Sequence, residues 1–569
     1  MAFSISPGVT TSEVNLTTVV PSVLTTAGAF VGKFNWGPAN KRIQISSETQ
    51  LVTTFTQPDS NTATSYFTAA SFLAYGNNLK VVRSVGINGR NASANTSATT
   101  QIANEDQFQY NYLNNLTNAN TYGPFVARYS GVLGNSLTIS VVDSASWSTT
   151  WNINGVGVSS YFAGAPGTSI AANTAGASND QIHVVVMDTT GSISGSKNTV
   201  LETFQFLSKA SDGKDALGNS NYYKNYIFNN SKYIYAIDPV NYGTTSSTWG
   251  LPTAGVSFGT LSTPQTISLS GGFDDQPTDA VLANAWNYFA NADETDVSLL
   301  ITADADVTIQ QTVMGIASSR KDCIAFISPP SANVVNQAGN ETTNITNWVN
   351  ALATATSHAV ADCGWKYMFD KYNNIYRWIP LNGDIAGTCV YTDSVRDPWF
   401  SPAGYNRGNL KNVVKLAWNP SKAQRDILYP LGVNPVATFP GQGTLLFGDK
   451  TFLNQPSAFD RINVRRLFIV LEKAIATASK FSLFEFNDDF TRNQFVALVT
   501  PYLRDVQGRR GITDFRVVCD TTNNTPQIID SNQFVGDIYI KPARSINFIQ
   551  LNFVAVRTGV SFTEVVGQF

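Results

Sequence analysis

The sequence predicts a mixed α+β protein of several domains that ends in extended β-strands. The chain has 569 residues, a length that corresponds to roughly three or four domains with an ample buried core. Helical and strand periods alternate in the middle of the chain, whereas short β-like runs separated by Gly, Asn and Ser dominate the part before it. Both ends of the chain show the period of two that is typical of strands.

The composition favours a structural protein over a nucleic-acid binder. Lys and Arg total 37 against 40 Asp and Glu, and charged residues make up only 14% of the chain. This near balance argues against general nucleic-acid binding, which needs an excess of positive charge to displace counterions from phosphate.

The cysteines and the apolar runs exclude further classes. Four cysteines lie far apart with no CxxC pair, so they predict reduced core thiols rather than a zinc site or a disulfide framework. The first residues lack the pattern of a signal peptide, and no run of about 18 apolar residues occurs. We therefore expect a protein that starts in a cytoplasm and does not insert into a membrane.

The N-terminal residues predict a strand outside any core. Phe3, Ile5 and Val9 alternate with polar residues around a Pro7-Gly8 turn signal. The segment is too short to bury a core of its own. We expect it to add a strand to a neighbouring copy of the chain.

The next segments change from mixed structure to β-structure. Residues 19 to 88 predict strands and one helix, because apolar residues between Tyr66 and Ala74 recur at helical spacing. Between Asn88 and Tyr122 the chain is rich in Asn, Ser, Thr and Ala, which predicts an exposed loop at an insertion point. From Gly123 to about Thr266, runs such as LTISVVD and IHVVVMD predict a β-rich insertion.

Helices and strands alternate after SLSGG, residues 268 to 272. Helices are predicted near Thr278–Ala290 and Val307–Ser319, and the strands VSLLITA and CIAFISPP follow them in turn. This alternation predicts a small α/β unit with a partly parallel sheet.

A basic cluster accompanies the helix predicted from Asp460, as N-cap, to about Ser479. Arg461 and Arg465 are four residues apart and share one side of this helix, Arg466 extends that side, and Lys473 also lies away from the apolar stripe. The cluster has two interpretations: a contact with an acidic partner, or ion pairs with acidic groups of the same fold.

The C-terminal end alternates as the N-terminal end does. Apolar residues recur at nearly every second position within two stretches: Ile549, Leu551, Phe553, Val560, Phe562 and Val565. This is the period of a strand with one covered face. Because the last residues lie beyond the body's final long strand, we expect them to pair with a neighbouring copy.

Two short motifs resemble catalytic signatures but lack the surroundings that catalysis needs. GTLLFGDKT, residues 443 to 451, resembles a phosphate-binding loop, yet Asp449 precedes Lys450 and places a carboxylate where a polyphosphate would lie. GVSFG, residues 255 to 259, matches a nucleophile elbow, yet a strand and a loop rather than a helix are predicted after it. The sequence predicts no catalytic residue, cofactor or metal site, and we expect the protein not to be an enzyme.

Long motifs spread over nearly the whole chain resemble one known family. In the C-terminal part they are FDRINVRRLF, NDDFTR, FRVVCDTTNNTP and KPARSINFIQLNFVA. Upstream, SPGV, GKFNWGPA, FLAYGNNLKVVR, YSGVLGNSL, DKYNNIYRWIPLNGDIAG and SPAGYNRG follow in the same order. The sequence resembles the tail sheath proteins of contractile-tailed bacteriophages.

The resemblance implies a particular domain organisation. It comprises an inner α+β domain built from the N- and C-terminal segments, an α/β middle domain and an inserted β-rich outer domain, with extended terminal β-arms. The expected ranges are 1–20 for the N-terminal arm, which packs with the inner domain, 21–88 plus 267–398 for the middle domain, 89–266 for the outer domain, and 399–569 for the inner domain with a C-terminal arm from about 557. Longer family members carry a further outer module near residues 88 to 122.

The resemblance also implies a function. It implies a subunit that polymerises as stacked hexameric rings around the inner tail tube and contracts to drive the tube through the host envelope for genome ejection. The implied partners are copies of itself, the inner tail tube protein, and baseplate and tail terminator proteins, with no specific nucleic acid. The implied location is the contractile tail of a virion assembled in the host cytoplasm.

The family places its C-terminal domain against the tube, which makes Arg461, Arg465, Arg466 and Lys473 candidate tube-facing residues. Two alternatives stay open. The sheath of a phage-derived contractile injection particle would have the same fold. The Asn, Thr and Gly content would also suit a β-rich surface or adhesion protein.

Overall fold

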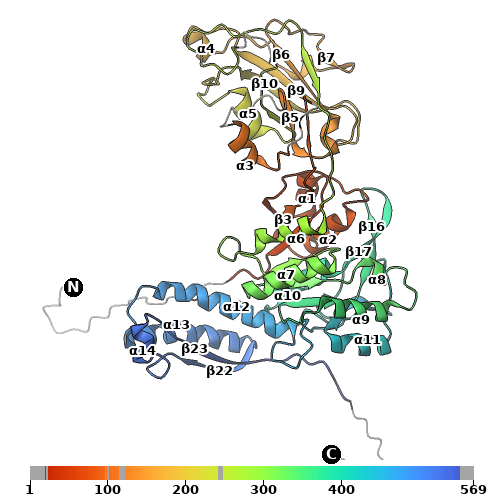
Figure 1. Ribbon diagram of the computed structural model, residues 1–569, viewed down its shortest axis with the longest axis vertical. Coiled ribbons are helices and arrows are strands. Elements are labelled where there is room, and N and C mark those ends of the chain that lie inside the picture. Colours follow the sequence, from red (N-terminus) through yellow and green to blue (C-terminus); the bar gives the residue numbers. More distant parts are fainter. Residues whose placement is uncertain are drawn as a thin grey trace, which may run out of the picture.

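The computed structural model describes residue 20 and residues 23–95, 98, 101–113, 122–240 and 248–551. Figure 1 shows three parts stacked along the long axis of the molecule. We call them the β-rich part (residues 90–273), the central part (residues 23–89 and 274–453) and the C-terminal part (residues 454–551). The mixed α+β class predicted from the sequence is confirmed.

A seven-stranded sheet forms the middle of the central part. Its strands lie in the order β19-β15-β14-β13-β1-β3-β2. Their bounds are β1 Gly28–Gly32, β2 Arg42–Ile45, β3 Leu79–Arg83, β13 Leu299–Ile301, β14 Ile324–Ile327, β15 Ala359–Asp362 and β19 Val433–Asn434. Every neighbouring pair is parallel except β2 and β3, so the partly parallel sheet predicted from the sequence is confirmed.

The sheet extends further along the chain than the sequence indicated. β19 lies within residues 399–569, which we expected to form the inner domain, yet Ala361 and Asp362 of β15 pair with its two residues. β1, β13 and β14 are buried at every position. Such continuous burial is typical of parallel strands whose two faces are both covered by helices.

Helices pack around this sheet in two groups. α2 packs on α10, while α7 packs on α6 and α9. The bounds are α1 Glu48–Phe55, α2 Ala63–Leu73, α6 Asp279–Ala285, α7 Val307–Arg320, α8 Ser331–Val334, α9 Glu341–Leu352, α10 Asn382–Val395 and α11 Lys422–Leu428. Asp306 caps α7 by accepting a hydrogen bond of 2.9 Å from the Ile309 amide. The predicted helices near Thr278 and Val307 are confirmed.

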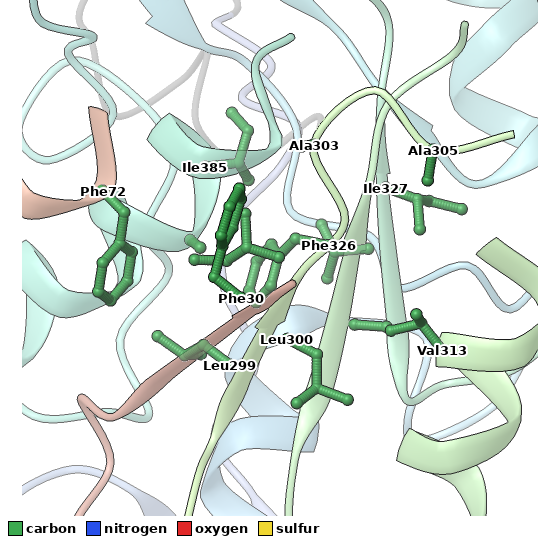
Figure 2. Close-up of a cluster of buried hydrophobic side chains, with 14 of the residues drawn as sticks. Phe30, Phe72, Leu299, Leu300, Ala303, Ala305, Val313, Phe326, Ile327 and Ile385 are labelled. Carbon is green, nitrogen blue, oxygen red and sulfur yellow. The ribbon is translucent and has the colours of Figure 1, made fainter. Parts of the chain in front are cut away.

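The main core lies between these helices and the sheet. Figure 2 shows Phe30, Leu299 and Phe326 from three neighbouring strands packed with side chains from the surrounding helices, including Ile385 of α10 and Val313 of α7. All five side chains are at most 1% exposed. Burial of each such side chain contributes roughly 1.5–3 kcal/mol to folding, so this core fixes the central part.

Two shorter antiparallel hairpins and one small strand flank the central sheet. β16 Trp365–Asp370 pairs with β17 Ile375–Pro380 and with β18 Lys415–Leu416, and β20 Val436–Phe439 pairs with β21 Gly443–Leu446. Among the residues that the structure describes, no helix combines the length and apolar character that crossing a bilayer requires.

The β-rich part contains two main antiparallel sheets, in agreement with the predicted β-rich insertion. One has the order β10-β9-β6-β12 and the other the order β11-β5-β4. The strands are β4 Asn91–Ser93, β5 Phe125–Ser130, β6 Leu137–Asp143, β9 Gln181–Asp188, β10 Thr199–Ser208, β11 Ile234–Ala236 and β12 Gln265–Ser268, with a hairpin of β7 Asn152–Ile153 and β8 Val156–Gly157. Its short helices are α3 Glu105–Phe108, α4 Ile170–Thr174 and α5 Tyr223–Asn230.

The expectation of an exposed loop between Asn88 and Tyr122 is wrong for much of the described part of that segment. β4 is buried at all three positions, and Phe108 belongs to an aromatic cluster in which its ring stacks on Tyr235. The Asn91 side chain donates to the backbone carbonyls of Ile102 and Ala127 at 3.1 and 3.0 Å. Small polar residues are buried here because the backbone satisfies their hydrogen bonds.

Arg83 joins the central part to the β-rich part. It ends β3 and is 2% exposed. Its guanidinium donates three hydrogen bonds of 2.8 Å, to the carbonyl oxygens of Phe34 and Gly37 in the central part and of Ser130 at the end of β5. Burial lowers the pKa of Arg83 to about 10. One side chain therefore fixes the position of three backbone segments at the neck of the molecule.

The C-terminal part packs two long helices on a β-hairpin. Its elements are α12 Ile462–Ser479, α13 Asp489–Gly508, β22 Ile512–Val518, α14 Pro526–Asp530 and β23 Asp537–Pro542. Asp460 was expected to cap α12, but the helix begins two residues later, and its N-cap residue Arg461 makes no side-chain capping bond. Figure 1 shows this part lying across the end of the molecule opposite the β-rich part.

Candidate functional site

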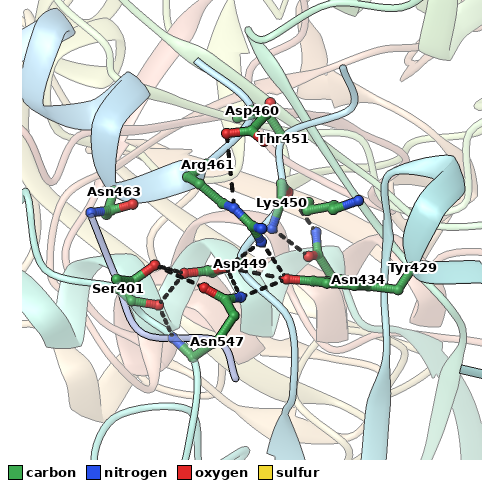
Figure 3. Close-up of polar contacts among 12 residues, drawn as sticks. Ser401, Tyr429, Asn434, Asp449, Lys450, Thr451, Asp460, Arg461, Asn463 and Asn547 are labelled. Carbon is green, nitrogen blue, oxygen red and sulfur yellow. Dashed lines mark hydrogen bonds and ion pairs between the residues drawn. The ribbon is translucent and has the colours of Figure 1, made fainter. Parts of the chain in front are cut away.

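The most densely bonded polar site around the C-terminal segment centres on Asp449. This residue follows β21 and is 3% exposed. Figure 3 shows side chains from four separate stretches of the chain converging on its carboxylate. A buried carboxylate requires such partners, since leaving it unpaired costs several kcal/mol.

One carboxylate oxygen of Asp449 binds the start of α12. Asp449 Oδ1 lies 3.1 Å from Arg461 Nη1 and accepts a hydrogen bond of 3.3 Å from Tyr429 Oη. Arg461 Nη1 also donates to Tyr429 Oη at 2.5 Å. The three side chains form a closed triangle that joins α12 to the central part.

The same carboxylate fastens the segment that leaves β23 toward the C-terminus. Ser545 Oγ donates to Asp449 Oδ2 at 2.7 Å, and Asn547 Nδ2 donates to Asp449 Oδ1 at 3.0 Å and to Tyr429 Oη at 2.9 Å. Ser401 Oγ adds a bond of 3.1 Å to Asp449 Oδ2. We call Asp449, Arg461, Tyr429, Ser401, Ser545 and Asn547 the anchor network.

The residues between and beyond the anchored ones expose apolar side chains. Ile546 and Phe548 are 82% and 85% exposed, and Ile549 and Leu551 are 78% and 71% exposed. Residues 543–551 belong to no helix or strand. The segment is therefore held by its polar side chains and presents apolar ones to solvent, an arrangement that predicts a partner.

Electrostatics reinforce the anchor network. Burial disfavours the charged form of Arg461, but Tyr429 and Asp449 outweigh burial and raise the pKa of Arg461. Burial and the neighbouring Asp449 carboxylate raise the pKa of Tyr429. Arg461 thus stays charged and the Tyr429 hydroxyl keeps its proton, which preserves the donors that Asp449 needs.

The loop that resembles a phosphate-binding motif is a structural turn. The Lys450 amide donates to the Asn434 side chain at 2.8 Å, and the Thr451 amide donates to the Asp460 carbonyl at 3.1 Å. The Lys450 ammonium lies 4.7 Å from the centre of the Tyr429 ring. Both amides thus donate to groups of the same chain and do not point into a loop where they would bind a phosphate.

The prediction that Arg465 and Arg466 form an exposed basic face is wrong. They are 7% and 4% exposed. Both oxygens of Asp393 accept from Arg466, at 2.8 and 2.6 Å, and Arg465 donates to Ser357 Oγ at 2.6 Å with its guanidinium 4.0 Å from the centre of the Phe459 ring. The physical reason is that α12 is covered on one side by the C-terminal part and on another by the central part. Its arginines lie on the side that faces the central part.

Arg461 and Lys473 are also engaged within the chain. The Arg461 side chain is 18% exposed and belongs to the anchor network. The Lys473 side chain is 14% exposed, pairs with Asp296 and lies 3.3 Å from Ser298 Oγ. Of the two interpretations of the basic cluster, the structure favours ion pairs within the fold.

The predicted arm residues lie outside the described residues: Phe3, Ile5, Val9, Val560, Phe562 and Val565. The sequence reasoning missed the anchor network. Ser545 and Asn547 stand within the motif KPARSINFIQLNFVA, and Asp449 is the residue that departs from the phosphate-binding pattern of GTLLFGDKT. The available signal was therefore the position of Asp449 within the loop motif and that of Ser545 and Asn547 within a family motif.

The fold and the site define a multi-part subunit whose C-terminal segment leaves the body from a fixed anchor. The family model described as "Phage tail sheath protein central domain" matches residues 277–452, and that described as "Phage tail sheath C-terminal domain" matches residues 454–555. The tail sheath protein of Vibrio phage KVP40 is 33% identical over 710 residues that cover 99% of this chain and 100% of that protein. The tail sheath protein of Enterobacteria phage T4 is also 33% identical, covering 99% of both chains.

The chain therefore belongs to the phage tail sheath family, whose members are structural proteins of contractile tails. The aligned length of 710 residues exceeds the 569 of this chain, so the KVP40 relative contains segments that this chain lacks.

Solved structures share the fold. The sheath tail protein from Desulfitobacterium hafniense superposes with a TM-score of 0.52 at 13% identity, covering 91% of this chain and 94% of that one. The sheath tail protein from Listeria innocua gives a TM-score of 0.51 at 12% identity, covering 92% and 96%.

Proposed function

We propose that this chain is the repeating subunit of a contractile tail sheath, which stacks as hexameric rings around an inner tail tube. Contraction of the sheath drives the tube through the host envelope for genome ejection. The observation that carries the proposal is the similarity to tail sheath proteins along 99% of the chain. Family membership favours this function over a β-rich surface or adhesion protein.

The mechanism requires no nucleotide. The extended polymer is a metastable packing, separated by a barrier from a packing of lower free energy. Assembly against baseplate and tube stores the free energy that contraction releases. Inner tail tube, baseplate and tail terminator proteins are the proposed partners, the assembly site is the host cytoplasm, and the final location is the virion.

The terminal arms connect the copies in this proposal. Residues 1–20 and those from about 557 add strands to neighbouring copies. The copies therefore stay connected through these arms while the contacts between their folded domains change. Five backbone hydrogen bonds at a net ~0.5–1.5 kcal/mol each give one arm several kcal/mol. The anchor network supports this proposal, because it fixes the point at which the C-terminal segment leaves the body.

The proposed placement puts the C-terminal part innermost, the central part in the middle and the β-rich part outermost. The family resemblance supports this order. Arg465 and Arg466 are buried and cannot contact a tube, so in this placement the tube meets other residues of the C-terminal part.

Removal of Gly559–Phe569 tests the arm proposal. We expect a folded, soluble protein that sediments as a small species, whereas the full chain forms rings or tubes in electron micrographs. A matched control replaces the same residues by a Gly-Ser stretch of equal length, which keeps the chain length and removes the strand pattern. Long tubes from either variant would overturn the arm proposal, and an unfolded product would show that the strand completes its own subunit.

A sheath of a phage-derived contractile injection particle remains the second candidate. Membership of the family does not distinguish a sheath on a particle that packages DNA from a sheath on a particle that does not. The DNA content of particles that contain this chain separates the two. Packaged DNA indicates a virion, and its absence from intact, contractile particles indicates an injection device.

A further inference from the structure

The turn between α12 and α13, together with the first residues of α13, exposes a cluster of large apolar side chains. We call residues 480–490 the aromatic loop. Five of its eleven residues are large, apolar and exposed: Phe481, Leu483, Phe484, Phe486 and Phe490. A contiguous cluster of this kind on a soluble body is typical of an interaction site.

Phe484 is the most exposed member of this loop and has an unusual backbone conformation. Its φ is +70°, in the left-handed region that bulky side chains rarely adopt. Its ring is fully exposed. Both the strained backbone and the exposed aromatic ring lower the stability of the fold, so folding alone does not explain them.

A hollow lies beside the loop. Its volume is about 60 Å³, and its lining is half apolar (Ala478, Phe481, Phe495 and Leu498) and half polar (Ser482, Glu485, Thr491 and Gln494). The rings of Phe481 and Phe495 in this lining offer contacts to an apolar side chain of a partner.

The aromatic loop and the exposed C-terminal segment lie at opposite ends of the C-terminal part. Ser545 is held by the anchor network beside Arg461, at the start of α12, and the loop follows the end of that helix. Figure 1 shows the turn between α12 and α13 and the exit of the chain toward the C-terminus at opposite ends of these helices.

The segment cannot reach the loop of its own chain. α12 has 18 residues and is therefore about 27 Å long. The six residues from Ile546 to Leu551, fully extended, span at most about 20 Å. While the anchor network holds Ser545, only the loop of another copy can receive these apolar side chains.

We propose that the aromatic loop of one copy docks the apolar segment Ile546–Leu551 of a second copy. The inference rests on the self-assembly set out above as the proposed function. Two different surfaces on the same chain that bind each other give a head-to-tail contact, which closes into rings or continues as a helix. The docked segment lies before the proposed C-terminal arm and is distinct from its strand pairing.

The first test removes the exposed rings without disturbing the backbone. In Phe484→Asn combined with Phe486→Ser, the asparagine accepts the left-handed conformation, so thermal stability should be unchanged or higher. The critical concentration for assembly should rise at least tenfold. Leu217→Ser, which removes an equally exposed apolar side chain from the β-rich part, is the matched control and should assemble as the unaltered chain does. Unchanged assembly of the loop variant would overturn the proposal.

The second test maps the contact. All four native cysteines are buried, so introduced thiols can be cross-linked selectively with a short bismaleimide. A chain with Ser482→Cys, mixed and co-assembled with a chain with Gln550→Cys, should give covalent dimers. Leu217→Cys mixed with Gln550→Cys should give none.

The outcomes separate this inference from the proposed function. Tubes that form without the Ser482–Gln550 cross-link overturn the loop as the docking site and leave the sheath function intact. A cross-link within single chains carrying both substitutions, found in dilute unassembled protein, overturns the contact between copies. Failure of the unaltered chain to assemble at all overturns the proposed function itself.

Discussion

The anchor network makes a quantitative prediction about the root of the C-terminal segment. In Ser545→Ala combined with Asn547→Ala, the two hydrogen bonds to the Asp449 carboxylate and the one to Tyr429 Oη are lost, while the contacts of Asp449 with Arg461 and Tyr429 remain. Hydrogen bonds to a charged group contribute about 1.5–3 kcal/mol each. Because Asn547 is exposed and Ser545 only partly buried, we take the lower end for the two bonds to the carboxylate, about 3 kcal/mol in total, which increases the detached population of the segment about 100-fold.

Trypsin measures that population directly. Trypsin cleaves after arginine, and Arg544 is exposed and immediately precedes Ser545. Because a protease binds the residues on both sides of the cleaved bond in an extended conformation, the Arg544–Ser545 bond is cleaved only when Ser545 and Asn547 have detached. When opening is fast relative to cleavage, the cleavage rate is proportional to the open population. The appearance of the fragment that begins at Ser545, followed by mass spectrometry, should accelerate about 100-fold in the double variant.

Ser531→Ala, at the C-cap of α14, removes a hydroxyl that donates to the Gln527 carbonyl at 2.8 Å, and should leave the cleavage rate unchanged. Thermal unfolding should be unchanged in Ser531→Ala, and in the double variant the loss of stability should not exceed the same ~3 kcal/mol. An acceleration below threefold in the double variant would refute the anchoring role of the network.

Three further variants test buried charges. Arg466→Met leaves Asp393 unpaired and should cost about 3–5 kcal/mol in chemical denaturation, with most of the loss recovered when Asp393→Leu is added; no recovery would contradict the pairing. Arg83→Met leaves three buried carbonyls without a donor and should lower stability by at least about 3 kcal/mol; a smaller loss would contradict the neck role. Burial raises the pKa of Asp362 from 3.8 to about 7, so protonation stabilises the fold below pH 4 and this contribution, up to about 4 kcal/mol, is lost as pH rises to 7. Calorimetry should show a decline in stability between about pH 4 and 7 that Asp362→Asn lacks.

Periodic segments were predictable because local pattern and burial agree in them. α7 and β14 follow apolar spacing that the sequence displays, and their neighbours in the sheet have the same pattern. The family resemblance was visible in long motifs and is confirmed by the relatives. In these parts, each local preference points to the same fold.

The misplaced residues share one physical cause. Helical periodicity treats a charged side as exposed, and it cannot show that Asp393 lies in the fold beside Arg466, 73 positions along the chain. The same holds for Asn91, whose polar side chain is buried because backbone carbonyls of distant residues accept from it. Burial of polar groups depends on partners that only the tertiary structure supplies.

The two-sided burial of α12 determines which parts of the subunit can move independently. Ile462 and Ile469 belong to the core of the central part, whereas Leu467 and Leu471 belong to the core of the C-terminal part. A helix shared between two cores resists their separation, because its apolar side chains would have to leave one of them.

Ion pairs on the same helix add to this resistance. Arg466 pairs with Asp393 of α10, Lys473 pairs with Asp296 before β13, and Arg461 pairs with Asp449 after β21. The basic cluster therefore fastens the C-terminal part to the central part along the length of α12. In a contracting sheath, these two parts would move as one body, so the rearrangement falls on contacts between copies and on the terminal segments that connect them.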